Sequence, residues 1–307
     1  MSAQQIPHPD RPMLGIALML AFCVAAPVGD ALAKLLSAFP VVLLIWLRFA
    51  MQAVFMTPFM LARGHGLSMS RRVFWLVAAR TLTHIGGIGC MFTALRYLPL
   101  AEAVAIAFVM PFVLLLFGWL LLGEEVGPRR LGACAVGFLG TVMVIQPSFA
   151  AVGAPALLPL GCAVCFALFM LSTRAMAHEI DPFAMQVSSG LMAVTVLLPF
   201  LLAGAASGIP ALSVRMPQGV EWAFILGQGV IGSASHLLMG WSLRFAPAST
   251  LAPMQYLEIP FSVIVGWAIF GHLPNGLAAA GVVVTVAAGL YVIAREQRAA
   301  SRRAATA

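Results

Sequence analysis

Long apolar runs separated by short polar or charged segments fill the chain from about Met13 to Ala294. Each run is close to the roughly 20 residues that a helix needs to cross a bilayer core about 30 Å thick. The runs lack the two-residue alternation of a barrel strand, and backbone groups in lipid must bond within their own segment, so helices are predicted throughout. Ten spans are predicted, centred on 13–35, 41–61, 73–95, 101–122, 130–147, 155–175, 183–204, 219–242, 248–270 and 276–294.

The composition places the protein in a membrane. Apolar residues make up 62% of the 307 residues, charged residues make up 9%, and the mean hydropathy is +1.02. Soluble domains carry about a quarter charged residues, so this chain has too few polar groups to cover a soluble surface. The spans leave no room for a separate soluble domain, and the first run is longer than the apolar core of a signal peptide. The predicted fold class is an all-α integral membrane protein.

The distribution of Lys and Arg predicts the orientation. With the N-terminus placed inside, three of the 17 cationic residues fall on the opposite side (Lys34, Arg96 and Arg215) and two fall within spans (Arg48 and Arg80). The other twelve face the cytoplasm, namely Arg11, Arg63, Arg71, Arg72, Arg129, Arg130, Arg174, Arg244, Arg295, Arg298, Arg302 and Arg303. Cytoplasmic loops are enriched in Lys and Arg, so both termini are predicted to be cytoplasmic. The net charge of +7 therefore reports orientation, and no nucleic-acid partner is expected.

The two halves of the chain resemble each other. With a shift of 148 residues, 94–99 (ALRYLP) lies over 242–247 (SLRFAP) and Gly118-Trp119 lies over Gly266-Trp267. With a shift larger by one residue, Pro111-Phe112 lies over Pro260-Phe261. Five spans per copy is an odd number, so the second copy must cross the membrane in the opposite sense. The prediction is two inverted five-helix repeats, 12–147 and 155–294, between a polar tail (1–11) and a basic tail (295–307), as in carriers that alternate access around a midplane site.

Several of these motifs are shared with a known family. They are Leu47-Arg48-Phe49, the 95–99 turn, Pro111, Leu122-Gly123-Glu124 and the glycines 132, 137 and 140. Through them the chain resembles the drug/metabolite transporter superfamily, in its ten-span branch with two EamA domains. The resemblance implies a secondary transporter of the bacterial inner membrane, whose cavity is lined by the third, fourth, eighth and ninth spans. The second copy has Gly271-His272 where the family usually has Gly-Glu, so no role of Glu124 transfers to His272.

The substrate is less defined. The stretch Gly29 to Lys34 is similar to the branch that includes riboflavin and S-adenosylmethionine carriers. A small polar metabolite is expected, namely an amino acid, a vitamin such as riboflavin or a nucleoside-like compound. The sequence leaves the exact substrate, the direction of transport and the oligomeric state open.

Ionisable residues within the spans are candidate functional groups, because each costs about 2.5–3.5 kcal/mol to insert and usually faces a cavity or a partner. They are Asp30, Arg48, Arg80, His84, His236 and Glu258. Arg80 on the third span and Glu258 on the ninth both lie near the middle of the membrane. They are predicted to pair in the empty site, or to offer a cation and an anion to a zwitterionic or polar substrate.

Further residues complete the predicted binding set. His84 lies one helical turn after Arg80, where it either couples protons or simply bonds between helices. Gln228 occupies the repeat position of Arg80, and Gln255 and Tyr256 precede Glu258.

A second set lies nearer the outer surface. Asp30 and Arg48 have similar depths and are predicted to form a structural or gating ion pair. Lys34, one turn after Asp30, is the alternative partner.

Prolines in the predicted spans and the absence of known catalytic motifs both bear on the mechanism. Helical hydrogen bonding should be interrupted at Pro27, Pro111, Pro253 and Pro260, unless these prolines are simply tolerated, as in many membrane helices. No GxxxxGK[ST], HExxH or GxSxG motif occurs, and the five cysteines lie in apolar runs, so no nucleotide, metal or cofactor is expected. A channel and a polytopic membrane enzyme remain the alternatives to a carrier.

Overall fold

The computed structural model describes residues 12–122, 128–207, 209, 212–246, 251–274 and 276–305, and Glu124 lies outside them. This part of the chain is helical and contains no strand. Its elements are α1 (Pro12–Leu35), α2 (Val41–Ala62), α3 (Arg71–Ala94), α4 (Leu100–Ala107), α5 (Met110–Leu122), α6 (Pro128–Val152), η1 (Ala154–Leu157), α7 (Leu158–Met176), α8 (Pro182–Ser207), α9 (Glu221–Phe245), η3 (Ala252–Leu257), α11 (Glu258–Phe270) and α12 (Gly276–Ala305).

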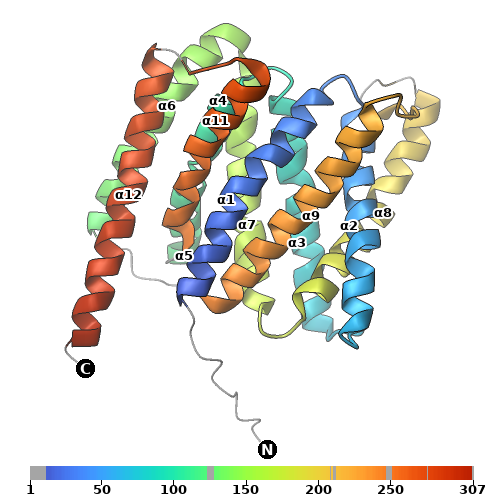
Figure 1. Ribbon diagram of the computed structural model, residues 1–307, viewed down its shortest axis with the longest axis horizontal. Coiled ribbons are helices and arrows are strands. Elements are labelled where there is room, and N and C mark those ends of the chain that lie inside the picture. Colours follow the sequence, from blue (N-terminus) through green and yellow to red (C-terminus); the bar gives the residue numbers. More distant parts are fainter. Residues whose placement is uncertain are drawn as a thin grey trace, which may run out of the picture.

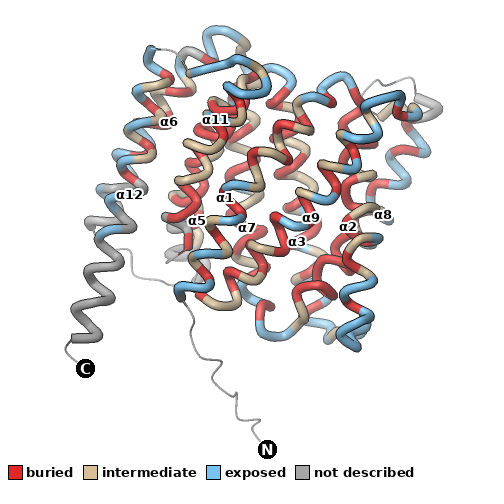
Figure 2. Tube along the Cα trace, viewed as in Figure 1, coloured by how far each residue is buried: buried red, intermediate tan, exposed pale blue. Residues whose placement is uncertain are grey.

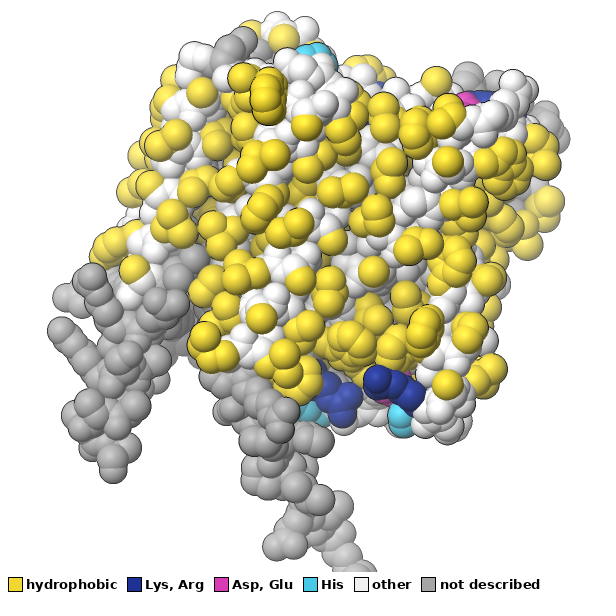
Figure 3. All heavy atoms as spheres, in the orientation of Figure 1, with side chains coloured by type: hydrophobic (Ala, Val, Ile, Leu, Met, Phe, Trp, Pro, Cys, Tyr) yellow, Lys and Arg dark blue, Asp and Glu magenta, His cyan; other side chains and the backbone are white. Residues whose placement is uncertain are grey.

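The helices form a membrane bundle. Seven helices of the described chain are long and apolar enough to cross a bilayer, and three shorter apolar stretches (Leu100–Leu114, Met254–Phe270 and Gly276–Ala288) coincide with the predicted fourth, ninth and tenth spans. Hydrophobic side chains cover the side of the bundle, while Lys and Arg gather at the lower end of the view (Figure 3). The all-α membrane fold is confirmed, and the protein is a multi-pass membrane protein. The count of ten spans stays a prediction.

The two ends of the bundle serve below as reference points. The lower end in Figure 1 is where α1 begins and α12 ends, and the upper end is where α1 ends and α2 begins. Buried residues concentrate along the central helices, and exposed residues lie at the two ends and along the outer helices (Figure 2).

The main packing partners join the two halves of the chain. α1 packs along α9, α3 along α7, α2 along α8, and α6 along α12 (Figure 1). In the predicted repeat, α1 corresponds to α7 and α3 to α9, so the α1–α9 and α3–α7 pairs are equivalent. The α2–α8 and α6–α12 pairs each map onto themselves. Two halves related by a two-fold axis would pack in this way, and the inverted repeat itself stays a prediction.

Close helix packing at one edge of the bundle depends on glycine. A Cβ atom on Gly140 of α6 would lie 2.9 Å from the carbonyl oxygen of Gly281 on α12. In the opposite direction, a Cβ on Gly281 would lie 2.5 Å from the carbonyl oxygen of Gly140. The two backbones can therefore touch only because neither residue has a side chain, as at other small-residue interfaces in membranes.

The fourth and ninth predicted spans are each divided. α4 ends at Ala107 and α5 begins at Met110, while η3 ends at Leu257 and α11 begins at Glu258. Pro111 and Pro260 lie in the first turn of α5 and α11, where a residue without an N–H group costs no helical hydrogen bond. These two divisions fall at matching repeat positions. Pro27, by contrast, lies inside α1, which continues on both sides of it.

Candidate functional site

A cavity lies where the two divided spans meet the central helices. It holds about 780 Å³ of empty space, counting the open solvent at its mouth. Its apolar lining comes from Phe22, Ala26, Gly29, Ile88, Met91, Phe92, Ala107, Phe108, Met110, Cys162, Ala163, Phe166 and Gly232. Its polar lining comes from Asp30, Arg48, Gln228, Ser235, His236, Gln255 and Glu258. Both halves of the chain therefore contribute to one site.

Glycine makes room for the cavity's guanidinium group. Arg48 of α2 lies against Gly232 of α9, where an added Cβ would come 2.9 Å from Arg48 Nε and 3.0 Å from Nη2. The guanidinium also lies 5.5 Å from the centre of the Phe49 ring. Arg48 is 4% exposed, and its Nη1 has no hydrogen-bond partner among the described residues.

Arg80 does not pair with Glu258 as the sequence predicted. Its three guanidinium nitrogens donate to neutral groups of α7 and α8, namely Thr173 Oγ1 (2.9 Å), Ser189 Oγ (2.6 Å) and Gln186 Oε1 (3.1 Å). The guanidinium also lies 4.4 Å from the centre of the Phe169 ring. Arg80 is fully buried behind the side chains that line the cavity. Because α3 packs along α7, closer polar partners take the hydrogen bonds that were expected to reach Glu258.

His84 lies one helical turn further along α3 and pairs with another histidine. Its Nε2 lies 3.2 Å from Nε2 of His236 on α9. Aromatic rings surround the pair, with Phe169 4.5 Å and Phe49 5.1 Å from the His84 ring centre. His236 lines the cavity, whereas His84 lies behind it. One imidazole must donate to the other, so the pair joins the cavity wall to the Arg80 region.

The predicted outer set is divided between two locations. Asp30 and Arg48 both line the cavity, but no hydrogen bond between them is present in the described part of the chain. Lys34 does not pair with Asp30: its ammonium group donates to the carbonyl oxygens of Leu95 (2.7 Å) and Leu98 (2.6 Å). Those two carbonyls follow the end of α3, so Lys34 joins α1 to the α3–α4 turn.

The remaining predicted residues follow the same division. Gln228, Gln255 and Glu258 line the cavity. Tyr256 lies behind it, with its ring 5.4 Å from that of Phe108. The sequence assigned no binding role to His236, Ser235 or the four lining phenylalanines. The sequence of an apolar helix does not show whether a Phe lines a cavity, packs against another helix or contacts lipid.

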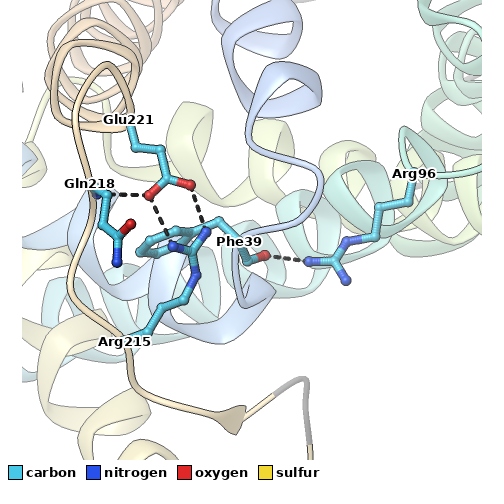
Figure 4. Close-up of polar contacts among 5 residues, drawn as sticks. All are labelled: Phe39, Arg96, Arg215, Gln218 and Glu221. Atoms are coloured by element: carbon cyan, nitrogen blue, oxygen red, sulfur yellow. Dashed lines mark hydrogen bonds and ion pairs between the residues drawn. The ribbon is translucent and has the colours of Figure 1, made fainter.

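Polar contacts close the upper end of the bundle (Figure 4). Arg96 donates to the carbonyl oxygen of Phe39 at 2.5 Å, and the Arg215 guanidinium lies 4.5 Å from the centre of the Phe39 ring. Glu221 holds Arg215 through two hydrogen bonds of 2.6 and 3.0 Å, and accepts a third, of 2.9 Å, from the Gln218 backbone. We call Phe39, Arg96, Arg215 and Glu221 the upper closure. It ties the α1–α2 turn of the first half to the α8–α9 segment of the second.

A comparable set closes the lower end. Asp181 lies 4.0 Å from Arg63 and 3.6 Å from His65, and Glu179 accepts a hydrogen bond from Arg72. We call these five residues the lower closure. It ties the α7–α8 turn of the second half to the α2–α3 segment of the first. In the predicted repeat, the α1–α2 turn corresponds to the α7–α8 turn, and the α8–α9 segment corresponds to the α2–α3 segment.

No group of three or more His, Cys, Asp or Glu residues suited to a metal ion occurs in the part of the chain that the structure describes. Cys162, which lines the cavity, is a free thiol.

Comparison with known proteins identifies the family. The model of the EamA-like transporter family matches the chain twice, over residues 13–146 and 154–295. The chain belongs to the EamA-like transporter family. It is therefore a small-metabolite transporter and not an enzyme.

Curated relatives of this EamA-like protein extend over almost its whole length. It is 26% identical to a riboflavin transporter of Rhizobium johnstonii over 95% of the chain and 94% of the relative. It is 24% identical to an S-adenosylmethionine uptake transporter of Rickettsia felis (95% and 96%), and 27% identical to a pseudopaline exporter of Pseudomonas aeruginosa (89% and 94%). A solved crystal structure shares the fold, with a TM-score of 0.63 at 19% identity over 94% of this chain and 96% of that one.

Proposed function

We propose that this protein is a secondary transporter that moves a small polar metabolite across the bacterial inner membrane by alternating access. An amino acid, a vitamin such as riboflavin or a nucleoside-like compound is the expected substrate. The named relatives are transporters of riboflavin, S-adenosylmethionine and pseudopaline, which supports a small metabolite as the substrate of this protein.

One observation carries the proposal: a mainly apolar cavity with several polar and charged side chains lies between two divided spans at matching positions of the chain. Phe108 and Met110 line it at the α4–α5 division, and Glu258 lines it at the start of α11. In secondary transporters with inverted repeats, discontinuous helices at the midplane hold the substrate. The equivalent pairing of α1 with α9 and of α3 with α7 supports two inverted halves, 12–147 and 155–294.

The two closures are the proposed gates. The upper closure seals the cavity from outside, and the lower closure seals it from the cytoplasm. Since each closure joins the first half to the second, rocking one half against the other would separate one set of contacts while the other is kept. The Arg63 and Arg72 end is assigned to the cytoplasm by the distribution of Lys and Arg.

The test is a metabolite-wide comparison of uptake and efflux between cells with and without the protein, followed by flux of the identified compound into vesicles. A carrier gives saturable flux, and a trapped unlabelled substrate accelerates entry of the labelled one. Flux that never saturates and shows no counterflow would instead indicate the alternative, a channel.

Proton coupling is a separable part of the proposal. His84 and His236 form a buried pair of titratable groups at the cavity wall. If this pair or Glu258 exchanges protons during transport, flux depends on the pH gradient and an uncoupler abolishes it. Flux unchanged by an uncoupler would leave the histidine pair as a hydrogen bond between α3 and α9.

A further inference from the structure

Four buried polar atoms of residues that line the cavity have no hydrogen-bond partner among the described residues. They are Nη1 of Arg48, Oε1 of Gln228, Nδ1 of His236 and Oε1 of Gln255, whose residues are 4%, 2%, 7% and 2% exposed. A buried polar atom without a hydrogen bond is costly, so atoms of this kind at a cavity wall indicate a ligand that completes them. The two glutamine oxygens are acceptors, the Arg48 nitrogen is a donor, and His236 Nδ1 is either one according to its tautomer. This set calls for a ligand with N–H or O–H donors and at least one acceptor.

The charged side chains of the lining do not balance. Asp30 and Glu258 are two carboxyl groups, whereas Arg48 is the single guanidinium among the described lining residues. Arg80, the other buried cation nearby, directs its donors to Thr173, Ser189 and Gln186 and lies behind the wall. Buried charges are stable when paired, so a cavity with this composition favours a positively charged group.

Aromatic rings favour the same kind of ligand. Phe22, Phe92, Phe108 and Phe166 come from four different segments and face the same space as the two carboxyl groups. Aromatic faces attract cations and pack against flat apolar groups. The cavity therefore suits a compact molecule with an apolar or aromatic body and a charged amine or a similar cation.

Building on the transport function proposed above, we propose that the substrate is an organic cation or a zwitterion. Its cationic group binds at Asp30 and Glu258, with its N–H donors toward Gln228 and Gln255, and its acceptor group binds Arg48. Neutral ring systems and organic anions bring no cationic group to Asp30 and Glu258, so we expect them to bind more weakly.

A matched set of indoles tests the charge rule with the body held constant. The full-length protein is purified and reconstituted in vesicles of phosphatidylethanolamine and phosphatidylglycerol. Entry is then measured for tryptamine (cation), tryptophan (zwitterion), tryptophol (neutral) and indole-3-acetate (anion), with riboflavin as a second neutral probe. Thermal stabilisation of the protein in detergent by each compound provides a binding readout that does not need flux.

We expect tryptamine or tryptophan to bind and enter, and the neutral and anionic compounds to do neither. Glu258→Gln and Asp30→Asn should each weaken binding of the cation about a hundredfold, the effect of unpairing a buried charge. Glu102→Gln is the control, because Glu102 accepts a hydrogen bond from Ser148 on α6 and does not line the cavity. Size-exclusion profiles identify a variant that fails to fold, and Asp30→Glu keeps the charge if Asp30→Asn is unstable.

Three outcomes overturn the proposal and leave the transport function intact. One is binding and entry of riboflavin, tryptophol or indole-3-acetate at least as strong as that of tryptamine and tryptophan. Another is binding of the cation that survives in both carboxyl variants. The third is that tryptamine and tryptophan neither stabilise the protein nor enter, and the metabolite-wide flux comparison then tests transport separately.

Discussion

Gln228 and Arg80 occupy matching positions in the two halves, yet only Gln228 faces the cavity. On α3, the face that carries Arg80 packs against α7 and α8, where Thr173 and Ser189 accept its hydrogen bonds. On α9, the equivalent face meets α1 and α2 and borders open space. Sequence position alone could not separate these environments, because both residues are polar and both lie in apolar helices.

Arg80 is therefore expected to stabilise the folded protein and not to bind the substrate. Arg80→Ala removes the donor to Thr173 Oγ1 and Ser189 Oγ and one of the two donors to Gln186 Oε1, and should lower the free energy of unfolding by about 3–5 kcal/mol. Thermal melting in detergent measures it, with the exposed Arg71→Ala as the control. A melting temperature equal to that of the wild type, together with lost transport, would indicate that Arg80 takes part in substrate binding.

Gly232 is expected to be essential to the site because it leaves space for Arg48. Gly232→Leu puts carbon atoms where the guanidinium lies and should abolish substrate binding while the protein still reaches the membrane. Gly66→Leu is the matched control, since nothing lies within 4 Å of a Cβ at Gly66. Normal transport by Gly232→Leu would show that the position of Arg48 is unimportant.

At the scale of helices, the proposed gates lie in turns, and the cavity lies at the two divided spans. Pro111 and Pro260 mark the divisions of the fourth and ninth spans, and both could be recognised in the sequence. The contacts of the two closures could not be recognised in the sequence. Arg215 counted only as an outer positive charge, and its contact with Phe39 depends on two loops that lie 176 positions apart in the sequence and meet only in the folded bundle.

Opening one closure should change which side reaches the cavity, and Cys162 of the lining reports it. In a variant that keeps only this cysteine, Arg215→Ala should raise labelling by an impermeant maleimide added from outside. Arg72→Ala, its counterpart in the lower closure, should raise labelling from the cytoplasmic side instead. Equal effects of the two variants on both sides would contradict the assignment of gates.

The α6–α12 contact should tolerate no side chain. Gly140→Leu and Gly281→Leu are each expected to lower the yield and the melting temperature of the folded protein, because the backbones must separate. Gly132→Leu on α6 is the control, with nothing within 4 Å of its Cβ. If all three variants melt alike, the close approach does not stabilise the bundle.

For the whole molecule, the proposed inverted repeat predicts which residues share a compartment. Arg96 follows α3, and its repeat counterpart Arg244 lies near the end of α9, so the two should lie on opposite sides of the membrane. Cysteine substitution at each position and labelling of intact cells with an impermeant reagent measures this. Labelling of both from the same side would remove the antiparallel arrangement and the alternating-access mechanism with it.

The membrane class, the approximate spans, the bias in orientation and the similarity between the halves could all be predicted from the sequence. These properties follow from the length, composition and periodicity of segments, which are local and one-dimensional. Which polar groups meet depends on how the helices pack. In lipid the outside of a helix is as apolar as its packed side, so hydrophobicity does not tell which face points inward. Only packing placed Arg80 against α7 and α8, brought His84 to His236, and left Asp30, Arg48 and Glu258 around one cavity.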